Sequence, residues 1–156
     1  MKLQIAEEIA NKIIKRLEPH CSKIQVAGSI RRKKLEVHDI DIVLIPSNLW
    51  GLNIALKSIG RQVKSGNKIS QFITVGGHQV DIYFATPETW ATLLLIRTGS
   101  KESNIRLCSE AKKRNWKLCA TGSGLFNQDG ERIAGDTEAS IFNALGMAYV
   151  EPKFRE

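Results

Sequence analysis

Three aspartates occupy two otherwise apolar segments, and their spacing suits a metal site. Asp39 and Asp41 open the segment 39–45, and Asp81 lies inside the segment 80–84. Because side chains alternate between the faces of a strand, Asp39 and Asp41 should point the same way, roughly 6–7 Å apart. If the two strands are neighbours in one sheet, three carboxylates converge. Hard oxygen ligands of this kind suit Mg²⁺ or Mn²⁺.

The three aspartates are therefore the candidate metal ligands and catalytic residues. Carboxylates that bridge two ions hold both the attacking oxygen and the leaving phosphates of an in-line phosphoryl transfer. The alternative is a set of solvent-facing acids on an open sheet. The Asp39-Ile40-Asp41 pattern alone does not decide between the two interpretations.

A glycine–serine pair precedes these aspartates and predicts a phosphate-binding loop. Gly28-Ser29 follows the predicted strand 24–27, and Arg31 and Arg32 come next. Glycine lets the backbone approach a phosphate, serine donates its hydroxyl and N–H, and the guanidinium fork matches phosphate oxygens. A plain turn with solvated cations is the alternative. The combination of strand, Gly-Ser, arginine and Asp-x-Asp strand favours nucleotide binding.

Helical and alternating hydrophobic patterns predict a chain of mixed α and β structure. The predicted helices cover 2–18, 50–59, 87–96, 101–114 and a last helix that Asp136 or Thr137 caps and Gly146 ends. The predicted strands cover 24–27, 40–45, 61–64, 68–75 and 78–84, the last three joined as a meander by Gly66-Asn67 and Gly76-Gly77. We expect Trp50, Trp90 and Trp116 to pack in the core or between lobes.

The composition favours a polyanionic partner. The chain has 23 Lys and Arg against 16 Asp and Glu, a net charge of +7, which excludes an acidic solubilising protein. Three widely spaced cysteines fit neither a disulfide framework nor a zinc site, so we expect reduced thiols. The longest apolar runs fall short of the roughly 20 residues of a membrane span, and the N-terminus resembles no signal peptide.

The combined pattern resembles the family X DNA polymerases, the polymerase beta group of the nucleotidyltransferase superfamily. The resemblance rests on Gly28-Ser29-Ile30-Arg31-Arg32, on Asp39-Ile40-Asp41 and on Asp81. It is narrowed by Thr98-Gly99-Ser100 with Asn104 four residues later, which is similar to the thumb signature of that family. The resemblance covers almost the whole chain.

The resemblance implies an α+β fold of two parts. Residues 1–87 would form a catalytic palm, a mixed sheet with helices on one side, and residues 88–156 a small α/β thumb. It implies two Mg²⁺ ions, replaceable by Mn²⁺, on Asp39, Asp41 and Asp81, with Asp81 nearest the primer 3′-hydroxyl. The residues implied for nucleotide binding are Gly28, Ser29, Arg32, His38, Thr98, Gly99, Ser100 and Asn104, and those for DNA are Lys101 and Arg106.

The implied activity is DNA-directed DNA synthesis that fills short gaps in repair, with DNA and deoxynucleoside triphosphates as partners and no membrane. We expect a cytoplasmic, non-secreted monomer of prokaryotic or viral context, in a minimal form without lyase and fingers domains. The sequence departs from the family at Ile96-Arg97, where relatives carry Tyr-Phe against the sugar, and at His38, where they carry Gly. A non-polymerase or template-independent nucleotidyltransferase and a non-catalytic DNA-binding module remain alternatives.

Overall fold

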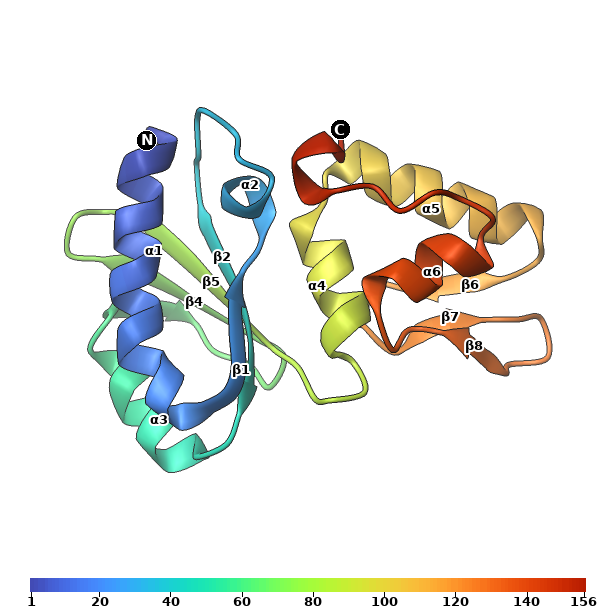
Figure 1. Cartoon of the computed structure of the whole chain (residues 1–156). Helices are drawn as coiled ribbons and strands as arrows, with labels where there is room; N and C mark the ends of the chain where they lie inside the picture. Colours follow the sequence, from blue (N-terminus) through green and yellow to red (C-terminus); the bar gives the residue numbers. More distant parts are fainter.

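The computed structural model describes all 156 residues, which form two β-sheets with helices around them (Figure 1). The helices are α1 (Leu3–Leu17), α2 (Gly28–Arg31), α3 (Leu49–Lys57), α4 (Trp90–Thr98), α5 (Lys101–Lys113) and α6 (Glu138–Ala144). The strands are β1 (Cys21–Val26), β2 (Ile40–Pro46), β3 (Gly60–Lys64), β4 (Ile69–Thr74), β5 (Gln79–Phe84), β6 (Lys117–Cys119), β7 (Gly124–Phe126) and β8 (Arg132–Ala134). Short 3₁₀ turns lie at Glu18–His20 and Pro152–Phe154.

The first sheet is mixed and has the strand order β1-β2-β5-β4-β3. Only β2 and β5 run parallel, and every other neighbouring pair is antiparallel. Helices α1 and α3 lie against one face of this sheet (Figure 1). The predicted mixed sheet with helices on one side is confirmed.

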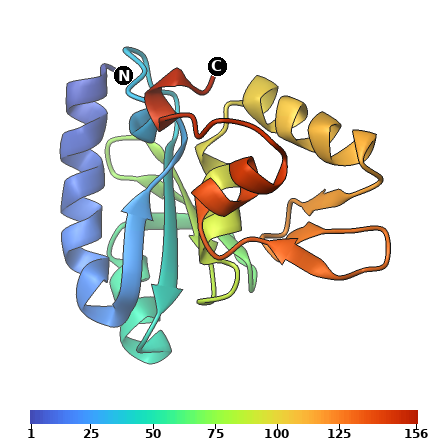
Figure 2. The ribbon, with the colours of Figure 1, turned by 45° about the vertical axis from the view of Figure 1, so that its right-hand side comes forward.

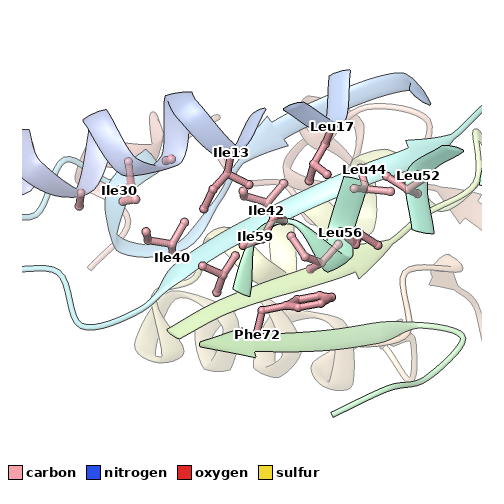
Figure 3. Packing of buried hydrophobic residues seen from close by; sticks show 14 of the residues in the cluster. Ile13, Leu17, Ile30, Ile40, Ile42, Leu44, Leu52, Leu56, Ile59 and Phe72 are labelled. Carbon is pink, nitrogen blue, oxygen red and sulfur yellow. The ribbon is translucent and has the colours of Figure 1, made fainter. Parts of the chain in front are cut away.

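Alternation along β2 explains why these helices pack where they do. Ile40, Ile42 and Leu44 are all fully buried and point toward the helices, where they meet Leu17 of α1 and Leu52 of α3 (Figure 3). The opposite face of β2 therefore carries the aspartate-bearing positions.

The second lobe is built around a three-stranded antiparallel sheet, β6-β7-β8, with α4, α5 and α6 packed near it (Figure 1). Its core contains Leu107, Leu125 and Phe142, each at most 1% exposed. Ser100 caps α5 as expected, because its side chain accepts a hydrogen bond from the Ser103 N–H.

Helix α4 also joins the two lobes. Leu93 and Leu94 pack against Val43 and Tyr83 on the acidic face of the first sheet. The C-terminal segment crosses back toward the first lobe, where Glu156 pairs with Lys34 (Figure 2). The two lobes are thus held together by apolar packing and by the returning chain end. None of the helices has the length and apolarity needed to span a bilayer.

The structure differs from the predicted elements in two places. The Gly28-Ser29 segment begins a short helix rather than a loop. Helix α4 begins at Trp90 rather than Pro87, because Thr86 and Thr89 exchange hydrogen bonds in a turn that precedes the helix.

The predicted packing is correct for two tryptophans and wrong for one. Trp90 and Trp116 are half-buried against core clusters, whereas Trp50 is 77% exposed. Helix α3 directs Leu52 and Leu56 into the core. At 3.6 residues per turn, a side chain two positions before Leu52 points away from that face.

Candidate active site

Two of the three predicted aspartates face each other across the parallel strands β2 and β5. Asp41 and Asp81 are register partners, so their side chains emerge from the same face of the sheet. Asp39 lies in the bend directly before β2, and its charge acts on Asp41. The sheet therefore brings together the residues that the sequence separates by 40 positions.

Two glutamines hold the carboxylate of Asp81, which is 7% exposed. Gln71 of β4 donates its amide to Oδ1 at 2.8 Å, and Gln79 donates to both oxygens at 3.3 Å. Sequence reasoning missed both residues. For Gln79 a signal was available, since it lies two residues before Asp81 on the same strand and so shares its face, whereas Gln71 reaches Asp81 only through the pairing of β4 with β5.

Asp39, Asp41 and Asp81 form an acidic cluster, in which the pKa of Asp41 is shifted. Burial raises its pKa to about 7, and the nearby charges of Asp81 and Asp39 add to the shift. The Tyr83 hydroxyl and the Arg97 guanidinium act in the opposite direction. The cluster thus holds an excess of negative charge that a divalent cation would relieve.

The carboxylates are not gathered into a closed ligand cage. No group of three or more His, Cys, Asp or Glu side chains is close enough to hold an ion as the side chains stand. The donor set, hard anionic oxygens with uncompensated charge, nevertheless fits Mg²⁺ or Mn²⁺.

Gly28 lies in direct contact with the cluster, and only glycine fits there. Its φ is +58°, and a Cβ at this position would stand 2.1 Å from Oδ2 of Asp41. A side chain would therefore displace the carboxylate as well as strain the backbone.

We expect Gly28→Ala to lower the free energy of unfolding and to weaken Mn²⁺ binding. Gly130→Ala is the matched control, because Gly130 has φ +80° and open space around its missing Cβ. Left-handed strain costs both variants about 1–2 kcal/mol, and the clash should cost Gly28→Ala about 1–3 kcal/mol more. Urea unfolding measures the difference, and equal losses for the two variants would contradict the assigned contact.

The arginines after Gly28 point to the second lobe. Arg31 Nη1 donates to Thr98 Oγ1 at 2.8 Å, and Arg32 Nη1 donates to the Thr98 carbonyl at 2.5 Å. Thr98 is fully buried, and its hydroxyl also donates to the Leu94 carbonyl. The Thr98 side chain is thus enclosed and hydrogen-bonded within the protein, and its contact with a nucleotide stays a prediction. Arg32 Nε is buried without a partner.

A pocket of about 410 Å³ opens beside the acidic cluster. Its lining is Tyr83, Ile96, Arg97, Gly99, Lys101, Asn104, Ile105 and Cys108. Three of the predicted site residues, Gly99, Lys101 and Asn104, thus share one cavity with Tyr83, whose hydroxyl reaches Asp41. The Asn104 amide donates to the Ile96 carbonyl at 2.9 Å, which leaves its buried Oδ1 without a partner.

The remaining predicted site residues lie around this region. Ser29 is half-buried, and its hydroxyl makes no hydrogen bond within the protein. Ser100 is 7% exposed and serves as the cap of α5. His38 is exposed directly before Asp39, and Arg106 is exposed on α5 and donates to the Glu156 carbonyl.

A buried ion-pair network joins the lobes next to Arg32. Glu138, at the start of α6, pairs with Arg31 at 2.7 Å and with Arg155 at 2.7 Å, and its side chain is 10% exposed. Glu138 and Arg155 are not among the residues predicted from the sequence. No local pattern marks them, since their partners are distant in the sequence.

The raised pKa of Asp41 predicts that the metal-free protein loses stability as the pH rises. The folded-state pKa of about 7 lies above the ordinary value of 3.8. The stabilisation is therefore complete below about pH 4 and is lost as the pH passes through 7. At about 1.4 kcal/mol per pH unit, the upper limit of the effect is about 4 kcal/mol.

Urea unfolding in EDTA at pH 5 and pH 8 measures this loss, with Asp41→Asn as the reference at each pH. The variant should be the more stable protein at pH 8, and its advantage should shrink at pH 5. A constant difference between the two proteins would show that Asp41 titrates at its ordinary value.

Comparisons with known proteins show the family to which the chain is related. The DNA polymerase beta thumb family matches residues 93–156. Repair DNA polymerase X of African swine fever virus is 30% identical over 165 residues, which cover 99% of this chain and 92% of the viral protein. The Bacillus subtilis DNA polymerase/3′-5′ exonuclease PolX is 28% identical over 159 residues, covering 99% of this chain but 27% of the bacterial protein.

Solved structures show the same fold. Leishmania infantum polymerase beta in a ternary P/T complex matches with a TM-score of 0.85 at 19% identity, covering 100% of this chain and 76% of that one. Its ternary gap complex gives 0.86 at 18% identity and 70% coverage of that chain. The viral relative and the shared fold together identify a polymerase beta-like nucleotidyltransferase. The chain belongs to the family X DNA polymerases.

Proposed function

We propose that this chain is a DNA-directed DNA polymerase that adds deoxynucleotides to a primer 3′-hydroxyl, and that it fills short gaps in DNA repair as a monomer. The observation that carries the proposal is the register pairing of Asp41 with Asp81 beside a pocket lined by Gly99 and Asn104. The viral relative named a repair DNA polymerase supports the repair role.

In the proposed reaction the primer 3′-oxygen attacks the α-phosphorus of the incoming triphosphate. A new P–O bond forms, the bond to the pyrophosphate oxygen breaks, and the hydroxyl proton passes to solvent water. Two Mg²⁺ ions held by Asp39, Asp41 and Asp81 would supply charge neutralisation for the attacking oxygen and the leaving pyrophosphate. The protein contributes mainly position and preorganised charge.

The residues near the carboxylates have matching proposed roles. Ser29 offers a free hydroxyl and Arg32 an unpartnered buried Nε, and both follow Gly28 at the edge of the acidic cluster. We assign them to the triphosphate. Asn104 and Gly99 line the pocket that we assign to the sugar and base. Thr98 is assigned to positioning the two arginines.

We propose a division into a palm of residues 1–87 and a thumb of residues 88–156, which the presence of two separate sheets supports. Lys101 lies at the pocket and Arg106 further along α5, and both are exposed. We assign these cations to the phosphate backbone of DNA. Because such contacts release counterions, binding should weaken steeply as salt rises.

Primer extension on a duplex with a single-nucleotide gap tests the proposal. Each of the four deoxynucleoside triphosphates is offered separately, with Mg²⁺ and then Mn²⁺. Addition of the nucleotide complementary to the template supports it. Addition that ignores the template supports a template-independent transferase, and DNA binding without addition under either metal supports a non-catalytic module.

A further inference from the structure

Tyr83 and Arg97 form a stacked pair between the nucleotide pocket and Asp41. Tyr83 lies on β5 two residues after Asp81, so both side chains share one face of the sheet. The Arg97 guanidinium of α4 stands 4.4 Å from the centre of the Tyr83 ring. The Tyr83 hydroxyl donates to Oδ1 of Asp41 at 3.4 Å. The three residues form a continuous chain of contacts.

The carboxylates of Asp41 and Asp81 differ in the number of side chains that donate hydrogen bonds to them. Asp81 has two glutamine amides on its carboxylate, whereas the Asp41 carboxylate has the Tyr83 hydroxyl as its sole hydrogen-bond donor in the protein. Gly28 leaves Asp41 room on its other side. The orientation of Asp41 therefore depends on where the Tyr83 hydroxyl lies.

Packing and the arginine together fix the Tyr83 ring. The ring is 8% exposed and packs beside Val43, Leu93 and Leu94. Arg97 makes no hydrogen bond and no ion pair within the protein and is exposed, so the ring face is its main contact. Of the residues that pack against the Tyr83 ring, Arg97 is the one that also lines the pocket, whereas Val43, Leu93 and Leu94 do not.

We propose that Tyr83 is a positioning residue for Asp41, that Arg97 holds Tyr83 in place, and that the pair sets the affinity of the carboxylates for the divalent cation. This inference rests on the metal site of the proposed function. Partners that orient metal ligands change metal affinity by about 10–100-fold when they are removed. The present 3.4 Å separation is long for a hydroxyl donor, and a shift of about 0.5 Å brings it into the usual range.

The pair also makes the pocket and the metal site sensitive to each other. Both Tyr83 and Arg97 line the 410 Å³ pocket, and the free N–H donors of Arg97 face whatever enters it.

The test measures Mn²⁺ binding directly, by loss of the free-ion EPR signal, on the full chain without nucleotide or DNA. Tyr83→Phe keeps the ring and removes the hydroxyl, and we expect its Kd for Mn²⁺ to rise 10–100-fold. Tyr149→Phe is the matched control. Tyr149 also lies under an arginine, with the Arg155 guanidinium 5.4 Å from its ring, and its hydroxyl makes no hydrogen bond.

Two variants at Arg97 separate stacking from charge. Arg97→Met should weaken Mn²⁺ binding in the same direction as Tyr83→Phe, because the ring loses its cover. Arg97→Lys keeps the charge without the planar stack and should resemble Arg97→Met. Since Arg97 is exposed, both proteins should fold, which far-ultraviolet circular dichroism verifies. Wild-type affinity in Arg97→Lys would overturn the holding role of the stack.

The metal dependence of primer extension gives a second measure of the same affinity. In Tyr83→Phe the metal concentration for half-maximal extension should rise by the same factor as the Kd, while kcat at saturating metal stays within about threefold of wild type. The inference alone would be overturned if Tyr83→Phe bound Mn²⁺ as tightly as Tyr149→Phe while the wild-type protein extended the primer normally. Mn²⁺ binding without any extension by the wild type would overturn the proposed function instead.

Discussion

Replacing Asp81 by Asn should abolish nucleotide addition while leaving the fold and DNA binding intact. Asparagine has the shape of aspartate, and its amide oxygen can still accept the hydrogen bond that Gln71 donates at 2.8 Å. The loss is therefore one of charge at the site that we assign to the ions. Removing one ligand of a two-metal site costs several kcal/mol of transition-state stabilisation, and about 4 kcal/mol corresponds to about a 10³-fold fall in rate.

Single-turnover extension of a gapped duplex measures this fall, and a gel shift at low salt measures DNA binding. Asp129→Asn is the matched control, because Asp129 is an exposed aspartate in the turn between β7 and β8. It should extend at the wild-type rate. Extension by Asp81→Asn within tenfold of that control would remove Asp81 from the catalytic set.

The strand and helix pattern was predictable because it depends on local alternation and on short-range signals. The apolar side chains of β2 alternate with Asp41, and Ser100 caps α5, as the sequence indicates. The pairing of β2 with β5 is different, since it joins segments about 40 residues apart in the sequence. Periodicity places Asp41 and Asp81 on one face of their strands, but not on neighbouring strands. The family resemblance supplied that step.

The roles of individual polar residues were less predictable, because burial depends on the tertiary structure. Thr98 belongs to a motif that implies nucleotide contact, and the structure encloses it between Leu94 and Arg31. Gln71 and Gln79 carry no motif. Gln79 precedes Asp81 by two residues on β5, whereas Gln71 comes beside Asp81 only through the pairing of β4 with β5. A motif thus identified the neighbourhood of the site, while the sheet register assigned the contacts within it.

Replacing Glu138 by Ala should strongly lower the free energy of unfolding, because the change leaves two arginines without the carboxylate that they share. Glu138 pairs with Arg31 of the first lobe and with Arg155, whose side chain is 0% exposed. Arg155 also lies 5.4 Å from the ring centres of Phe142 and Tyr149, so it has no route to solvent. Breaking a buried pair by removing one partner costs about 3–5 kcal/mol.

Urea unfolding followed by tryptophan fluorescence measures the loss, and thermal unfolding should show a midpoint lower by roughly 10 °C for a chain of this size. Glu131→Ala removes an exposed glutamate that has no ion pair and should change the free energy of unfolding by less than about 0.5 kcal/mol. Glu138→Gln, which keeps the size and one acceptor oxygen, should fall between the two.

The same variant tests how the lobes are coupled to the site. Arg31 directly precedes Arg32, and both arginines end on Thr98. Release of Arg31 from Glu138 should therefore loosen the segment that we assign to the triphosphate, and KM for the deoxynucleotide should rise several-fold at temperatures well below the midpoint. A loss of stability under 1 kcal/mol would contradict the role of Glu138 as the carboxylate that neutralises two buried arginines. The apolar contacts of Leu93 and Leu94 with Tyr83 would then be what holds the lobes together.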